Sequence, residues 1–495
     1  MSLYETLGPQ TTEYIINQTS LASVVSSAAH IPSLLRIAAR CPQLKIIISV
    51  DPLKDDDAEG PTKFSLLADF AQESGIKIYE MSEVEAIGAT SSIPINRPDP
   101  SNIATINYTS GTTGDPKGVV LTHANAVAAA SVARSICDIT ASDVLFSYLP
   151  LAHIYERVVE QSAFMAGASI GYFHGDVAAL VDDMKVLQPT GFNSVPRIYN
   201  RFGALVRRAV ESPGAKQRMS LFKSSGRPGV VAELGLQKAR RMMSAAAPID
   251  PDLQQLFRSV FRNEFIQGYG LTETYAIAMA QMGVDLSTGN CGGVLPSGEA
   301  CLQSVPDMDY LVTDTPRPRG ELLLRGTTLF REYYKDPEAT AKAIDDQGWL
   351  HTGDIVEVDE LGRFRIVDRK KNVVKLSQGE YISPERIENV YLANCDLLAQ
   401  AFVYGDPTQS FPVAILGIDP TAFAPFAAKI LGINIEASDL PSVIQAMRDE
   451  RVVSALVDIL HNVGKAKGLN SYERVRNVHL EIEPFTVTNE LLTAT

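Results

Sequence analysis

The sequence has few cysteines, no long apolar segment and no leader-like N-terminus, and each shortage excludes a class of protein. Its 495 residues include five scattered cysteines with no CxxC pair. This argues against a disulfide framework and against a zinc site, and is typical of reduced thiols in an intracellular protein. No stretch approaches the ~20 apolar residues of a transmembrane helix. No basic segment followed by an apolar one opens the chain, so we expect no secretory signal.

Basic residues are also scarce relative to acidic ones. The chain has 44 Lys and Arg against 58 Asp and Glu, a net charge of −14. Nucleic-acid binding and electrostatic attachment to anionic lipid both need a basic face. The composition therefore argues against a nucleic-acid partner, and leaves only a peripheral contact with a membrane open.

Short β-branched runs alternate with helical patterns over the first two thirds of the chain, which predicts an α/β fold. A helix is expected at 124–136 with Thr122 as its N-cap, and the Gly/Ser/Pro/Lys-rich segment 212–229 predicts a surface loop. Strands are expected at 44–51, 76–83, 105–110 and 118–123.

The pattern changes near Asp368, where a strand runs through a charged pivot into another strand and a helix. Beyond it, residues 443–463 place apolar side chains at helical spacing, and residues 475–483 alternate like a half-buried strand. We therefore predict a large domain over residues 1–367 and a small α+β domain over residues 368–495.

The stretch "TSGTTGDPKG" (109–118) combines glycines, hydroxyls and one lysine. Glycines let a backbone curl closely around a ligand, a concave row of N–H groups suits phosphate oxygens, and Lys117 adds charge. The lysine is preceded by Pro116 and followed by Gly118, unlike the loop of P-loop NTPases. The motif favours a bound polyphosphate; the alternative is a plain turn between two strands.

Three further stretches narrow this interpretation: "IQGYGLTETYA" (266–276), "QGWLHTGDIVEVDELGRFRIVDRKKNVVK" (347–375) and "SYLPLAHIYERVVE" (147–160). Together with the loop they resemble the adenylate-forming (AMP-binding) enzymes, and more narrowly the long-chain fatty acyl-CoA synthetases, over nearly the whole chain. The resemblance implies the adenylate-forming fold, with a large domain of packed sheets and helices and a small, mobile α+β domain.

The resemblance also implies an ATP site. Tyr269 would stack on adenine, Asp354 and Arg369 would hold the ribose hydroxyls, and Thr272 would donate to the α-phosphate. A carboxylate is a natural acceptor for two vicinal hydroxyls. The full implied ATP-binding set is Thr109, Ser110, Gly111, Thr112, Thr113, Gly114, Lys117, Gly268, Tyr269, Thr272, Asp354 and Arg369.

Further roles follow from the same resemblance. Glu273 would help hold Mg²⁺, which prefers oxygen ligands, and His153 would lie near the fatty acid carboxylate. With Thr272 and Lys117 these two residues form the implied catalytic set. Lys375 and Gly379 would contact CoA, with Gly379 lining the path of the pantetheine arm.

Each residue also has a plainer interpretation. The alternatives are a core aromatic for Tyr269, a helix-capping acid for Glu273, a satisfied core histidine for His153, a turn residue for Asp354 and a solvated charge for Lys375. Their joint occurrence in the expected order favours the functional roles.

The implied reaction activates a fatty carboxylate with MgATP to an acyl-adenylate and pyrophosphate, and then transfers the acyl group to CoA with release of AMP. The small domain would rotate about Asp368 between the two steps. The alternatives are a partly or non-catalytic homologue that binds nucleotide or acyl-adenylate, and a ligase for another carboxylic acid in secondary metabolism.

The sequence departs from the family at both ends and, more mildly, at Ala245, in a shortened region over 212–240 and at Asn489-Glu490, which replaces an Asn-Gly turn. The "LYETLG" motif, which the family places well inside its large domain, begins at Leu3, and the chain ends at Thr495, before the lysine that assists adenylation in the family. We expect this to weaken adenylation while thioester formation from acyl-adenylate survives. Ala245 replaces a glycine beside the adenine, where a methyl would crowd the base. Cytosol, endoplasmic reticulum surface and peroxisome all remain open, as do acyl chain length and oligomeric state.

Overall fold

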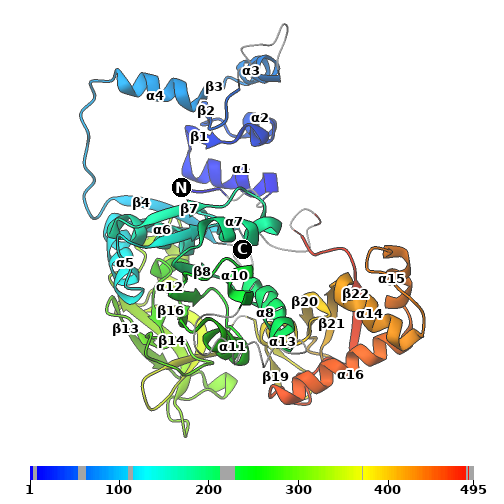
Figure 1. Cartoon of the computed structure of the whole chain (residues 1–495). Coiled ribbons are helices and arrows are strands. Elements are labelled where there is room, and N and C mark those ends of the chain that lie inside the picture. The colour runs from blue at the N-terminus through cyan, green and yellow to red at the C-terminus, as the bar shows by residue number, and fades with distance from the viewer. Residues whose placement is uncertain are drawn as a thin grey trace.

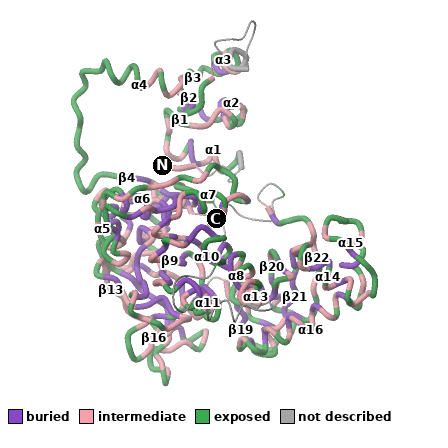
Figure 2. The backbone as a smooth tube through the Cα atoms, viewed as in Figure 1, coloured by how far each residue is buried: buried purple, intermediate pink, exposed green. Residues whose placement is uncertain are grey.

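The computed structural model describes residues 1–3, 8–53, 63–109, 115–211, 229–370, 372–486 and 489. It confirms the α/β prediction: sheets and helices are packed in layers, and one body dominates the centre (Figure 1). Most buried residues lie in this central body and in the C-terminal part (Figure 2). Among the described residues, no helix combines the length and apolar composition needed to cross a bilayer.

The central body is built on a seven-stranded sheet whose main strands run parallel. From edge to edge its strands are β12 (Gly293–Val294), β11 (Met279–Ala280), β10 (Glu264–Tyr269), β9 (Arg241–Ser244), β8 (Gly191–Ser194), β6 (Val144–Ser147) and β7 (Ser169–Tyr172). The helices between these strands are α6 (Ile154–Ala166), α7 (Leu180–Leu187), α8 (Pro196–Glu211), α10 (Gly229–Glu233) and α11 (Pro251–Phe261). Ligands of such sheets bind at the carboxyl ends of the parallel strands, so residues following β9 and β10 are well placed for a site.

Two antiparallel sheets complete the central body. One has the order β13 (Gly298–Gln303), β14 (Arg319–Gly326), β16 (Leu350–Val358) and β17 (Phe364–Arg369). The other has the order β15 (Glu332–Tyr333), β5 (Lys117–Thr122) and β4 (Ile103–Thr109). The short helix α12 (Pro337–Ala343) follows β15.

The helix α5 (His123–Ile136) begins where the sequence predicts. The Thr122 Oγ1 atom accepts a hydrogen bond from the Asn125 backbone N–H at 3.2 Å, and the Asn125 side chain accepts in return from the Thr122 N–H. This reciprocal pair satisfies two N–H groups at the helix start.

The N-terminal residues form a separate small layer. Here β1 (Ser23–Ser26), β2 (Ile46–Ser49) and β3 (Lys77–Glu80) pair in parallel. The strands expected at 44–51 and 76–83 are thus confirmed, although the second ends at Glu80. The accompanying helices are α1 (Gly8–Thr19), α2 (Ile31–Ile37), α3 (Lys63–Glu73) and α4 (Met81–Ala89). An exposed, extended segment leads from α4 to β4 (Figures 1 and 2).

The C-terminal part has its own hydrophobic core, whose members run from Leu376 to Leu480. Its elements are β18 (Val374–Lys375), β19 (Tyr381–Ile382), α13 (Pro384–Asn394), β20 (Leu398–Tyr404), β21 (Val413–Ile418), α14 (Pro420–Leu431), α15 (Leu440–Met447), α16 (Glu450–Ala466) and β22 (Asn477–Glu481). This separate core supports the proposed boundary at Asp368, which stays a proposal.

Two details of the C-terminal prediction can be scored. The strand expected at 475–483 is confirmed as β22. The helical pattern over 443–463 is split into α15 and α16, because Asp449 caps a new helix by accepting from the Arg451 N–H at 2.9 Å. Most of the predicted loop 212–229 lies outside the described residues.

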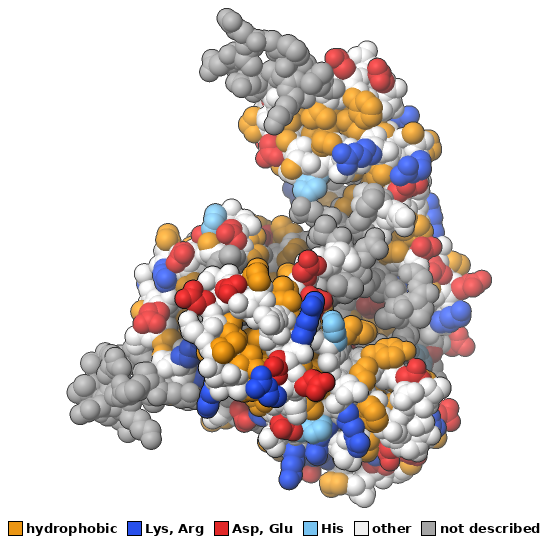
Figure 3. All heavy atoms as spheres, turned by 90° about the vertical axis from the view of Figure 1, so that its right-hand side faces the viewer, with side chains coloured by type: hydrophobic (Ala, Val, Ile, Leu, Met, Phe, Trp, Pro, Cys, Tyr) orange, Lys and Arg blue, Asp and Glu red, His pale blue; other side chains and the backbone are white. Residues whose placement is uncertain are grey.

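The cysteines behave as the sequence suggests. All five are free, with Cys41, Cys291 and Cys395 buried. On the face shown in Figure 3, basic and acidic side chains are interspersed, with apolar side chains between them.

Candidate active site

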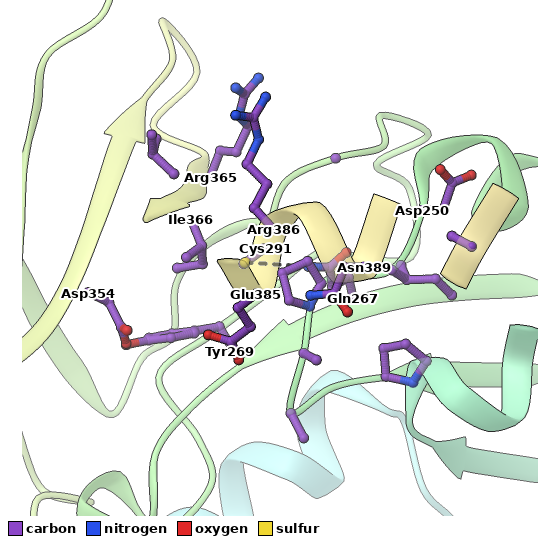
Figure 4. A pocket seen from close by; sticks show the side chains of 18 of the residues that line it. Asp250, Gln267, Tyr269, Cys291, Asp354, Arg365, Ile366, Glu385, Arg386 and Asn389 are labelled. Carbon is purple, nitrogen blue, oxygen red and sulfur yellow. Dashed lines mark hydrogen bonds between the residues drawn. The ribbon is translucent and has the colours of Figure 1, made fainter. Parts of the chain in front are cut away.

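A cavity of about 500 Å³ lies between the central body and the C-terminal part (Figure 4). Its walls come from the segment after β9, from the end of β10, from β17 and from one side of α13. It therefore opens at the carboxyl edge of the parallel sheet, where the fold favours a ligand site.

Four residues of the predicted ATP site line this cavity: Gly268 and the trio Tyr269, Asp354 and Arg369. Tyr269 ends β10, while Asp354 on β16 and Arg369 on β17 are paired across the two strands. The Tyr269 hydroxyl donates to Asp354 Oδ2 at 2.5 Å, and Arg369 Nε donates to Asp354 Oδ1 at 2.8 Å. Tyr269 and Asp354 point toward each other in Figure 4. The hydroxyl thus fixes the ring, while each carboxylate oxygen keeps a lone pair for another donor.

The electrostatics of this trio follow from burial. Asp354 is 2% exposed. Burial, followed by the neighbouring Asp354 charge, raises the pKa of Tyr269 well above its usual value, so the hydroxyl remains a donor. Arg369 Nε lies 2.8 Å from Asp354 Oδ1, and the attraction between the two charges offsets the free-energy cost of burying the carboxylate.

Two amide side chains that the sequence analysis did not single out also line the cavity. The carbonyl oxygens of Asn200 and Gln267 are buried and have no hydrogen-bond partner among the described residues. Buried acceptors are normally paired, so these two oxygens suit a ligand that carries N–H donors, such as the amino group of a base. The available signal for Gln267 was a polar residue that follows the apolar pair Phe265 and Ile266 within β10.

The loop after β9 corrects one expectation. Ala245 is buried in the hydrophobic core and does not line the cavity; Ala246 and Ala247 do. Ala246 has φ of +72°, a conformation that favours glycine. The methyl group beside the ligand site is therefore that of Ala246 or Ala247. Gly270, opposite, is needed for space, because a Cβ there would lie 2.2 Å from the Ala276 carbonyl oxygen.

A second group of predicted residues gathers where β5 meets β15. The Lys117 ammonium lies 5.0 Å from the centre of the Tyr333 ring, and the Tyr333 hydroxyl donates to Glu273 Oε1 at 2.7 Å. Thr272 and Glu273 lie on the 3-10 turn Thr272–Thr274, held by the Phe330 N–H donating to the Glu273 carbonyl at 2.7 Å. Tyr333 was not predicted from the sequence.

The base of the predicted phosphate loop is partly visible. Thr109 and Lys117 are paired across β4 and β5. Ser110, Gly111, Thr112, Thr113 and Gly114 lie outside the described residues, so their assignment stays a prediction.

His153 precedes α6 and caps it, its Nδ1 atom accepting from the Tyr155 N–H at 3.2 Å. Burial lowers the pKa of His153. The neutral ring therefore has a structural role, and its other nitrogen is left for the predicted contact with a carboxylate. This position does not line the cavity.

Lys375 and Gly379 lie on the hairpin β18–β19, where the Lys375 ammonium is 5.0 Å from the Tyr381 ring centre. Gly379 has φ of +93° and open space around its Cα. Neither residue lines the cavity in this arrangement. A role with CoA requires either a second substrate channel or a movement of the hairpin.

The predicted hinge is well anchored. Asp368 is 9% exposed; its Oδ1 accepts from the Arg369 N–H at 2.8 Å and its Oδ2 from the Tyr310 hydroxyl at 3.4 Å. Burial raises the pKa of Asp368. Next to it, the Lys370 ammonium contacts the buried Glu321 at 3.2 Å.

Comparisons with known proteins agree with this geometry. Residues 1–334 match a family model described as AMP-binding enzyme. The chain is 48% identical over its whole length to the peroxisomal acyl-CoA ligase 891 of Penicillium brevicompactum and spans 74% of that protein. It is 37% identical to the peroxisomal long chain acyl-CoA synthetase 6 of Arabidopsis thaliana and spans 71% of it.

Among solved structures, the A-PCP didomain of the carboxylic acid reductase from Segniliparus rugosus, in complex with AMP, superimposes with a TM-score of 0.80 at 25% identity. The match covers 99% of this chain and 65% of the didomain.

Proposed function

The chain belongs to the AMP-binding enzyme family, and we propose that it is an ATP-dependent acyl-CoA ligase acting on long-chain fatty acids. The observation that carries the proposal is the Tyr269–Asp354–Arg369 trio, brought together from three strands at the carboxyl edge of the sheet. The synthetases and ligases among the relatives support the acyl-CoA product, and the Arabidopsis relative supports the long chain.

In the first step the nucleotide occupies the cavity. The flat face of Tyr269 stacks on the adenine, and the carbonyl oxygens of Gln267 and Asn200 accept from its amino group. Asp354 and Arg369 hold the ribose hydroxyls, which directs the phosphates toward Thr272. When the α-phosphate and the fatty carboxylate are both held in the site, the entropy cost of bringing them together is met by binding, and the carboxylate is oriented for attack.

Lys117 and Thr109, with the loop between them, carry the β- and γ-phosphates in this proposal. An ammonium and hydroxyl donors stabilise the charge that moves onto pyrophosphate as the acyl-adenylate forms. His153 lies beside the fatty carboxylate as a neutral donor, with its orientation fixed by the cap at Tyr155.

Glu273 fits the role of magnesium ligand. One of its oxygens accepts from Tyr333 at 2.7 Å, and this bond orients the second oxygen. Mg²⁺ in nucleotide sites is commonly held by one or two protein carboxylates and the substrate phosphates, so one glutamate suffices. The ion, when bound, would neutralise phosphate charge.

In the second step the CoA thiol attacks the acyl carbonyl and AMP leaves. We propose that the C-terminal part rotates about Asp368 to bring Lys375 and Gly379 to the acyl-adenylate. The open space around Gly379 leaves room for a thin pantetheine arm. The names of two relatives suggest a peroxisomal site for this reaction, which microscopy of a tagged full-length protein would test.

The direct test combines purified chain, ATP, Mg²⁺, CoA and fatty acids of graded length, with acyl-CoA, AMP and pyrophosphate measured together. We expect equal amounts of all three products with long-chain acids. Release of ADP, or turnover that does not depend on the acid, would contradict the proposal. Fatty-acid-dependent ATP–pyrophosphate exchange, beside CoA capture of supplied acyl-AMP, separates the two steps.

A further inference from the structure

One contact joins the C-terminal part to the wall of the nucleotide cavity. Lys467, the C-cap residue directly after α16, places its Nζ atom 3.2 Å from Asp250 Oδ2 and 2.5 Å from Asp252 Oδ2. From α13, Asn394 Nδ2 donates to the same Asp250 oxygen at 3.2 Å. In Figure 1, α8 and α11 of the central body face α13.

The two oxygens of Asp250 accept from different parts of the chain. Its Oδ1 atom accepts from the N–H groups of Asp252 and Leu253, both at 3.0 Å, and so caps α11. Its Oδ2 atom is left for Lys467 and Asn394. One carboxylate therefore ties the start of α11 to the C-terminal part.

The segment that Asp250 ends is the cavity wall. Residues 246–250 all line the cavity beside Tyr269, and Lys467 itself lines it as well. Within this segment Ala246 has φ of +72°, a conformation that costs an alanine about 1 kcal/mol and persists only when neighbours enforce it.

The ion pair between Lys467 and Asp250 is largely shielded from solvent, which strengthens the attraction between the two charges. The side chains of Lys467 and Asp250 are 23% and 7% exposed, whereas Asp252 is 81% exposed. Burial alone would lower the pKa of Lys467, but the two aspartates outweigh it and raise the pKa, so the ammonium is charged. A second contact lies close by, because Arg207 on α8 donates to the Ala393 carbonyl at 3.4 Å.

We infer that Lys467 is a positioning residue: through Asp250 it holds the 246–250 wall against the nucleotide base, and so couples nucleotide binding to docking of the C-terminal part. The inference rests on the proposed function for the identity of the ligand. Coupling of this kind is reciprocal: if docking tightens nucleotide binding, bound nucleotide favours docking by the same factor.

The test compares two variants and their combination in the full chain. Lys467→Met removes the ammonium and keeps the stem, while Asp250→Asn keeps the helix cap, since asparagine is as good an N-cap as aspartate. Lys465→Met is the matched control, because Lys465 is exposed on the same helix and no ion pair to it occurs among the described residues.

We expect AMP to bind at least about fivefold more weakly to Lys467→Met and to Asp250→Asn. The double variant should bind AMP no more weakly than Lys467→Met alone, since that single change already removes the pair with Asp250 together with the exposed pair with Asp252. Lys465→Met should match the parent. Unchanged affinity in Lys467→Met, or additive losses in the double variant, would overturn the inference.

Because Lys467 also lines the cavity, weaker AMP binding alone would not separate positioning from a direct contact with the nucleotide. Hydrogen exchange of residues 245–251 without nucleotide separates the two, and it does not depend on the proposed function. Exchange should become faster in Lys467→Met and stay unchanged in the control. If the parent protein fails to bind AMP or ATP, the proposed function fails, and this exchange result still decides whether the contact holds the wall.

Discussion

Replacement of Asp354 by asparagine tests the core of the proposed nucleotide site. The carboxylate accepts from Tyr269 and Arg369 and is proposed to accept two ribose hydroxyls as well. Asparagine keeps the shape but has one acceptor oxygen, and its amide N–H group would face a donor. Hydrogen bonds to a charged group are worth about 1.5–3 kcal/mol. We therefore expect AMP and ATP to bind roughly 10- to 150-fold more weakly.

Calorimetric titration with ATP and with 2′,3′-dideoxy-ATP separates the ribose contact from a general effect. The parent should bind the dideoxy nucleotide weakly, and Asp354→Asn should bind both nucleotides with similar, weak affinity. If the variant loses as much affinity for dideoxy-ATP as for ATP, Asp354 does not act through the hydroxyls. Glu299→Gln is the matched control: Glu299 lies on β13 of the same sheet, accepts from Arg325 at 2.9 Å and does not line the cavity.

Three further predictions use other parts of the molecule. Tyr333→Phe removes the donor to Glu273, so the Mg²⁺ concentration for half-maximal turnover should rise severalfold with unchanged thermal stability; an unchanged Mg²⁺ dependence would contradict the orienting role. Glu156 is fully buried, and burial raises its pKa from 4.5 to about 8. The folded state therefore keeps a proton that the unfolded state releases, and Glu156→Gln should gain stability over the parent by up to about 1.4 kcal/mol per pH unit between pH 4.5 and 8; parallel stability curves in urea titrations would refute this. Thr122→Ala removes the cap of α5 and should cost about 0.5–2 kcal/mol of unfolding free energy, with Thr122→Ser close to the parent.

The elements that the sequence predicted well are those fixed by local chemistry. The α5 cap follows from Thr122 and Asn125, three residues apart, and the strands β2 and β22 follow from short alternating or apolar runs. The apolar spacing over 443–463 predicted one continuous helical pattern, but the structure has two helices. The spacing continues across the break at Asp449, so it does not reveal the break. A capping aspartate inside a periodic run was the signal that was missed.

The candidate site divides in the same way. The motifs named Tyr269, Asp354 and Arg369 in advance, because their types and order in the chain are informative. The sequence did not indicate that the Tyr269 hydroxyl would be tied to Asp354, or that Gln267 and Asn200 would present unpaired oxygens to the same cavity. Those facts depend on which side chains become neighbours when separate strands are packed.

By itself the sequence determined the α/β class, the nucleotide motifs and the family, because these depend on residue types at short, fixed spacings. Only the tertiary structure decided that Ala246 and Ala247, and not Ala245, line the cavity, and that Lys467 reaches Asp250 across 217 residues of chain. Contacts between distant segments are set by the packing of whole sheets and helices, and no local pattern of residues encodes which side chains that packing brings within hydrogen-bonding distance.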